Sequence, residues 1–64
     1  MNETEQAVLD ALRSLRRMFK RVYAWQVAME IEMSERTARY CLNKMENKRL
    51  VWRPYGQRSG WELA

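Results

Sequence analysis

The chain has 64 residues, 47% hydrophobic and 31% charged, a composition that predicts a single folded domain over residues 1–64 and excludes a disordered chain. One cysteine and no histidine exclude an internal disulfide and leave too few ligands for a zinc site, so no metal or other cofactor is expected. Twelve basic against eight acidic residues give a net charge of +4, which favours nucleic acid, anionic lipid or an acidic protein as partner.

The first predicted element is an amphipathic helix that starts near Glu3. Its apolar positions recur at steps of one, three, three and four residues, the spacing of one helix face: Val8, Leu9, Leu12, Leu15 and Phe19. Asn2 or Thr4 is expected as its N-cap, and acidic residues lie in its first turn. Its end is left open, because no Gly or Pro occurs before Pro54 and the pattern could continue through Val22 and Tyr23.

A second, shorter helix is predicted over residues 25–31. Val22 and Tyr23 favour extended structure, whereas Val27, Ala28 and Ile31 return to helical spacing. The sequence therefore predicts a break after the first helix and about two helical turns beyond it.

A third helix is predicted over about residues 34–48. Ser34 is expected as its N-cap, with Glu35 in the first turn. The core face consists of Ala38, Cys41, Leu42 and Met45. The opposite face carries long polar side chains, so this helix presents a donor-rich surface to its surroundings.

The last predicted element is a β-hairpin. Residues 50–53 and 61–63 read as two short strands, and the segment 54–60 between them is rich in turn-forming residues. The two strands should bring Trp52 and Trp61 onto the hairpin or against the first helix, while Trp25 either covers the core or stays exposed.

The predicted core draws on all of these elements. It comprises Leu9, Leu12, Leu15, Val27, Ala28, Ile31, Ala38, Leu42, Met45, Leu50 and Val51. Cys41 is expected as a small buried hydrophobe, and the five methionines as adaptable core filler.

The order helix, extended piece, helix, tight turn, helix, hairpin is typical of a winged helix-turn-helix, an α+β fold that is mostly α. Residues 33–51 resemble the recognition helix and following strand of bacterial regulators of the MarR, IclR and ArsR type. The matching positions are Met33, Ser34, Thr37, Ala38, Leu42, Met45, Glu46, Leu50 and Val51. The family usually has Gly where this chain has Glu32 and Arg49, so both residues are expected at positive φ.

The resemblance implies a double-stranded DNA-binding module, a small transcriptional regulator with its third helix in the major groove. There Arg forks onto guanine and Asn onto adenine, which makes Arg36, Arg39 and Asn43 the base-reading candidates. The candidates for phosphate contacts are Ser34, Thr37, Tyr40 and Lys44. The wing, about residues 53–60, would reach the minor groove or the backbone with Arg53, Tyr55, Gln57 and Arg58.

Other functions fit the sequence less well. The chain has no His, no G-x-S-x-G motif and no phosphate-binding Gly loop, so an enzyme is not expected. The main alternative is a winged-helix module that binds another protein or a second copy of itself without binding DNA. The basic amphipathic stretch 11–25 could instead bind an anionic membrane or a calmodulin-like groove. The ending Trp61-Glu62-Leu63 is similar to the wing of Z-DNA-binding domains, although the paired prolines of that family are missing.

We expect the protein in the cytoplasm. The acidic first residues are followed by no apolar segment of the kind that signal peptides contain. The longest apolar run, Val22 to Trp25, is far shorter than the roughly 20 residues of a membrane helix. A lone Cys41 fits a reducing compartment.

Overall fold

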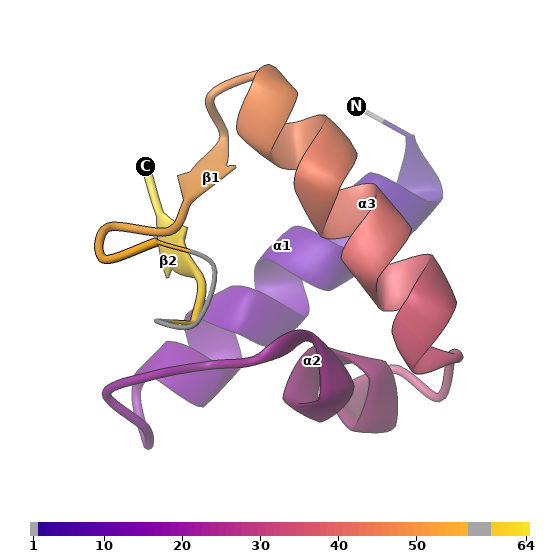
Figure 1. Ribbon diagram of the computed structural model, residues 1–64. Coiled ribbons are helices and arrows are strands. Elements are labelled where there is room, and N and C mark those ends of the chain that lie inside the picture. Colours follow the sequence, from indigo (N-terminus) through magenta and orange to yellow (C-terminus); the bar gives the residue numbers. More distant parts are fainter. Residues whose placement is uncertain (1, 57–59) are drawn as a thin grey trace.

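The structure is a computed structural model that describes residues 2–56 and 60–64. Its elements are the helices α1 (Glu3–Arg16), α2 (Ala24–Glu30) and α3 (Glu35–Asn47), followed by the strands β1 (Val51–Trp52) and β2 (Glu62–Leu63). Figure 1 shows α3 crossing in front of α1, with α2 below both helices and the hairpin at one side. The expected fold class is confirmed: a mostly helical α+β fold in a winged-helix-like arrangement. No helix within the described ranges is long and apolar enough to cross a membrane.

α1 begins and ends at positions that local chemistry explains. Asn2 is the N-cap, and its side-chain oxygen accepts a hydrogen bond from the Glu5 backbone N–H at 2.7 Å. The helix ends at Arg16, so Phe19, expected on its apolar face, lies beyond it and is 44% exposed. The physical reason is that Val22 must be extended to pair with Trp61, and the chain has to leave the helix before that point.

α3 ends in a hydrogen-bond pattern that requires left-handed backbone. Arg49 has φ 62°, its N–H donates to Glu46 O at 2.9 Å, and the Leu50 N–H donates to Met45 O at 2.9 Å. These two bonds form the Schellman motif, in which the residue after the cap is usually Gly. The expectation of positive φ at Arg49 is confirmed.

α2 also ends at a residue with positive φ. Glu32 has φ 54°, and the next residue, Met33, donates its N–H to Ala28 O at 3.0 Å. The short turn that follows leads to Ser34, whose hydroxyl accepts from the Thr37 N–H at 3.1 Å and so caps α3 as expected. The left-handed turn therefore fixes the angle at which α3 leaves α2.

The sheet is small and is extended by a third segment. β1 and β2 are antiparallel, with Val51 opposite Leu63 and Trp52 opposite Glu62. Val22 forms an isolated bridge with Trp61, whose N–H donates to Val22 O at 2.7 Å. Each strand is shorter than predicted, and the extended pair at 22–23 contributes a strand-like segment that joins the hairpin to the α1–α2 connection.

The core contains most of the residues predicted for it. Nine of the eleven are buried: Leu9, Leu12, Leu15, Val27, Ala28, Ala38, Leu42, Met45 and Val51. Ile31 and Leu50 are only partly buried, because each lies where a helix turns back toward the surface. The buried set also includes Val8, Ala11, Val22, Ala24 and Trp61, and the prediction that Cys41 is buried is confirmed.

Several large apolar side chains are more exposed than expected. Met18 and Met29 are both more than 70% exposed, so the prediction that the methionines fill the core is wrong for these two. Trp52 is 49% exposed, since it follows buried Val51 in β1 and successive strand residues point to opposite faces. Trp25, whose position was left open, is 50% exposed.

An ion pair between a buried carboxylate and a half-exposed lysine joins α1 to the end of α3. Glu5 is only 3% exposed, and both of its carboxylate oxygens accept hydrogen bonds from Lys48 Nζ, at 3.0 and 3.2 Å. This hydrogen bond is the main reason that the pKa of Glu5 is lowered, and the charges of Lys48 and Lys44 act in the same direction. The pair thus links the first turn of α1 to Lys48, the C-cap of α3.

Candidate nucleic-acid interface

The outward face of α3 is exposed along its whole length and carries the predicted site residues. Exposed positions are Ser34, Arg36, Thr37, Arg39, Tyr40, Asn43 and Lys44. The opposite side of the helix holds Ala38, Leu42 and Met45, each fully buried. α3 is therefore attached to the domain by one face, and the other face can meet a partner without disturbing the core (Figure 1).

The side chains on this face are arranged by local contacts. Arg39 is ion-paired with Glu35 one turn earlier, and Lys44 Nζ lies 5.6 Å from the centre of the Tyr40 ring. Arg36 forms no ion pair within residues 2–56 and 60–64. Of the two arginines predicted to read bases, Arg39 is thus bound to a carboxylate and Arg36 is not.

Two hydroxyls lie at the start of α3. The Ser34 hydroxyl donates to the Thr37 hydroxyl at 2.8 Å, in addition to accepting from the Thr37 backbone N–H. Both side chains are exposed. The phosphate contacts predicted for Ser34 and Thr37 stay predictions, and the Ser34 hydroxyl has the additional role of capping α3.

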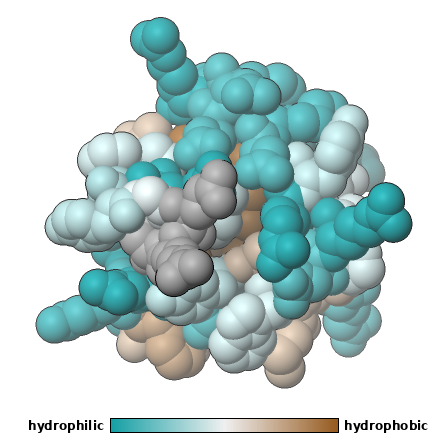
Figure 2. Space-filling model, viewed as in Figure 1, coloured by the Kyte–Doolittle hydropathy of each residue, from teal (hydrophilic) through white to brown (hydrophobic). Residues whose placement is uncertain are grey.

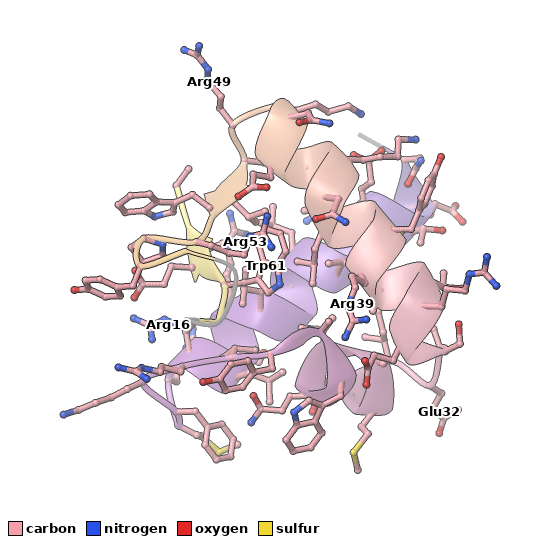
Figure 3. All side chains as sticks on the ribbon, viewed as in Figure 1. Arg16, Glu32, Arg39, Arg49, Arg53 and Trp61 are labelled. Carbon is pink, nitrogen blue, oxygen red and sulfur yellow. The ribbon has the colours of Figure 1, made fainter. Side chains whose placement is uncertain are left out.

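A groove separates α3 from the hairpin and brings together residues from four segments of the chain. It is lined by Tyr23, Ala24, Trp25, Arg39, Asn43, Arg53, Gly60 and Trp61. In Figure 3, Arg39 on α3 and Arg53 with Trp61 on the hairpin side lie on the two sides of this groove. Two of the three base-reading candidates therefore face a hollow whose other wall belongs to the predicted wing. A second, more open hollow over the outer face of α3 adds Arg36 and Tyr40 to the same continuous surface.

Arg53 is held in place by groups of the protein itself. Its guanidinium donates to the two carboxylate oxygens of Glu46 at 3.0 and 3.3 Å and lies 4.5 Å from the centre of the Trp61 ring. The side chain is only 23% exposed. Its predicted DNA contact stays a prediction, and Arg53 would have to share the guanidinium between Glu46 and a phosphate.

The rest of the predicted wing is described only in part. Tyr55 is 83% exposed and lines a basic hollow with Arg16, Lys20 and Arg21 from the end of α1 and the segment after it. Gln57 and Arg58, the two other wing candidates, lie outside the described residues. Among the described residues, the surface near the hairpin tip is therefore formed by Tyr55 together with the basic residues of this hollow.

Three residues of this surface were not among the predicted site residues. Glu46 and Trp61 hold the Arg53 side chain, and Tyr23 and Trp61 line the groove. The pairing of Val22 with Trp61 brings the segment that contains Tyr23 to the hairpin, and helical spacing along the chain does not predict this pairing. Among the described residues, no three His, Cys, Asp or Glu side chains are clustered as metal ligands.

Comparison with models of known protein families and with curated proteins finds no match to this chain.

Proposed function

We propose that this protein binds double-stranded DNA as a small transcriptional regulator of the cytoplasm, with α3 in the major groove and the hairpin against the adjacent backbone or minor groove. The observation that carries the proposal is the position of Arg39 and Asn43, which lie on the exposed face of α3 and also line the groove beside the hairpin. A helix and a wing on one surface are what a duplex with two neighbouring grooves requires.

The side-chain chemistry supports the same function. Arg recognises guanine and Asn recognises adenine through paired hydrogen bonds, and Arg36, Arg39 and Asn43 all lie on the exposed face. Thr37, Tyr40 and Lys44 are exposed on the same helix and carry groups that bind phosphate oxygens. Figure 2 shows that hydrophilic side chains cover most of this face, as a surface that meets a polyanion requires.

The test begins with selection of bound duplexes from a random pool, followed by titration of the preferred duplex and a scrambled one. Arg36→Ala should cost about 1 to 3 kcal/mol on the preferred duplex and flatten the preference at one base pair. Arg13→Ala is the matched control, because it removes the same charge from an exposed position on α1. Equal losses in the two variants would show that charge alone, and not α3, determines the binding.

The alternative function is protein binding through the same fold without DNA. Exposed apolar side chains outside the α3 surface favour it, above all Met18 and Met29. The two functions are separated by the wild-type titration: absence of duplex binding at low salt, where the net charge of +4 helps most, would overturn the DNA proposal.

A further inference from the structure

An apolar patch lies between the end of α1 and the outer side of α2. Its side chains are Met18, Phe19, Trp25 and Met29, with exposed fractions of 73%, 44%, 50% and 72%. They surround a hollow whose lining also includes Leu15, Gln26 and Glu30. In Figure 2 hydrophobic side chains are visible along the lower edge of the molecule, near α2 in Figure 1. Small globular proteins seldom expose a contiguous patch of large apolar side chains, and such patches usually mark an interaction site.

The charges at the two ends of the patch have opposite signs. Lys20 and Arg21 directly follow Phe19, whereas Glu30 follows Met29 and Glu32 lies two residues further along. Figure 3 labels Glu32 on one side of the molecule and Arg16, at the end of α1, on the other. Arg16 is ion-paired with Glu62. In the part of the chain that the structure describes, no ion pair is formed by Lys20, Arg21, Glu30 or Glu32. Both ends are thus available to an external partner.

A surface that is basic at one end and acidic at the other is complementary to itself. When two copies are related by a two-fold axis, the same patch serves both of them, and the basic end of one meets the acidic end of the other. An acidic partner helix would match only one end and would be repelled at Glu30 and Glu32. We propose that two copies of this chain pair through the patch, with Lys20 of one copy against Glu30 of the other.

The proposed dimer does not depend on DNA binding. The outward face of α3 is made of other residues. Trp25 also lines the groove beside α3, and Lys20 also lines the hollow next to Tyr55, so the variants that separate the two functions are those at Met18 and Met29. Pairing through Met18, Phe19 and Met29 would leave Arg36 and Asn43 accessible. The oligomeric state and the DNA affinity can therefore be measured independently, and the failure of one proposal is distinguishable from the failure of the other.

Sedimentation velocity of the wild-type protein over a range of concentrations is the first measurement, and a concentration-dependent shift from monomer to dimer is expected. Met29→Glu places a charge in the patch and should raise the dissociation constant at least about tenfold. Trp52→Glu is the control, because Trp52 has nearly the same exposure as Trp25 but lies on β1, outside the patch. Met18→Glu provides a second patch variant, and thermal melting checks that each variant is folded.

A charge exchange tests the orientation. Lys20→Glu alone and Glu30→Lys alone should each weaken the dimer, because each places like charges against one another, and the double variant should recover most of the lost affinity. A chain that stays monomeric at its highest soluble concentration overturns the proposal and leaves the patch to a different protein. Dimers that tolerate both Met29→Glu and Met18→Glu also overturn it, since the interface would then lie elsewhere.

Discussion

The Glu5 carboxylate, buried against Lys48, makes the stability of the fold depend on pH. The Lys48 hydrogen bond lowers the pKa of Glu5 below its ordinary value of 4.5, so the folded state binds this proton less readily than the unfolded chain does. The pair therefore stabilises the fold fully above pH 4.5, and the stabilisation disappears as the pH falls through the folded-state pKa. Chemical denaturation at successive pH values should show this loss in the wild-type protein.

The matching variant is Glu5→Gln. It should be less stable than the wild-type protein at neutral pH and should lose less stability on acidification, so that the two proteins converge in acid. Glu3→Gln is the control, since Glu3 lies in the same first turn but is exposed and has no ion pair among the described residues. An equal acid response in wild type and Glu5→Gln would mean that other carboxylates govern the acid sensitivity.

Arg49 is strained, because its φ of 62° belongs to the region that Gly occupies without a steric penalty. Arg49→Gly should stabilise the protein by about 0.5 to 1 kcal/mol. The substitution removes the steric cost of positive φ in the folded state, and this gain in free energy exceeds the cost of the more flexible unfolded chain. Ser14→Gly, at an exposed position in the last turn of α1 where the backbone is right-handed, should instead destabilise by roughly 0.5 kcal/mol. Melting temperatures that move in the same direction for both variants would contradict the assignment of strain.

At the level of elements, the hairpin depends on a close approach at Gly60. Its φ is 82°, and a Cβ placed there would lie 3.0 Å from Val22 O and 3.1 Å from Val22 N. Because these are backbone atoms held by the Val22–Trp61 bridge, Gly60→Ala should cost about 2 to 5 kcal/mol. Gly56→Ala shares the positive φ but meets no atom within 4 Å, so it should cost only about 1 to 2 kcal/mol. Comparable losses of melting temperature would show that backbone conformation alone, and not contact with Val22, makes Gly60 necessary.

The elements that sequence reasoning located correctly are those set by local chemistry. Ser34 caps α3 because its hydroxyl accepts from the backbone N–H of Thr37, three residues later. The positive φ of Glu32 and of Arg49 follows from the hydrogen bonding at the end of a helix. The end of α1 was not predictable in this way. No Gly or Pro lies between Arg16 and Phe19, and the break is imposed by Val22, which forms a bridge with Trp61, the residue before β2.

The same distinction applies to the whole molecule and its candidate site. Helical periodicity was sufficient to place Arg36, Arg39 and Asn43 on the exposed face of α3. It could not indicate that Arg53 is bound by Glu46 and stacked on Trp61, because that contact requires the hairpin to fold back over α3. The apolar patch was not predictable for a related reason. Met18 and Met29 are apolar and were expected in the core, and the packing of α1 on α2 determines that they are exposed.

The salt dependence of DNA binding tests the molecule as a whole, because every lysine or arginine that neutralises a phosphate releases counterions and steepens the plot of log affinity against log salt. Lys44, exposed on α3 above the Tyr40 ring, is expected to make one such contact. Lys44→Ala should therefore weaken preferred and scrambled duplexes alike and reduce the slope by about one unit. Arg13→Ala should leave the slope unchanged. If Arg13→Ala reduces the slope and Lys44→Ala does not, the duplex lies along the basic stretch 13–21 of the chain, and α3 is not the element that enters the groove.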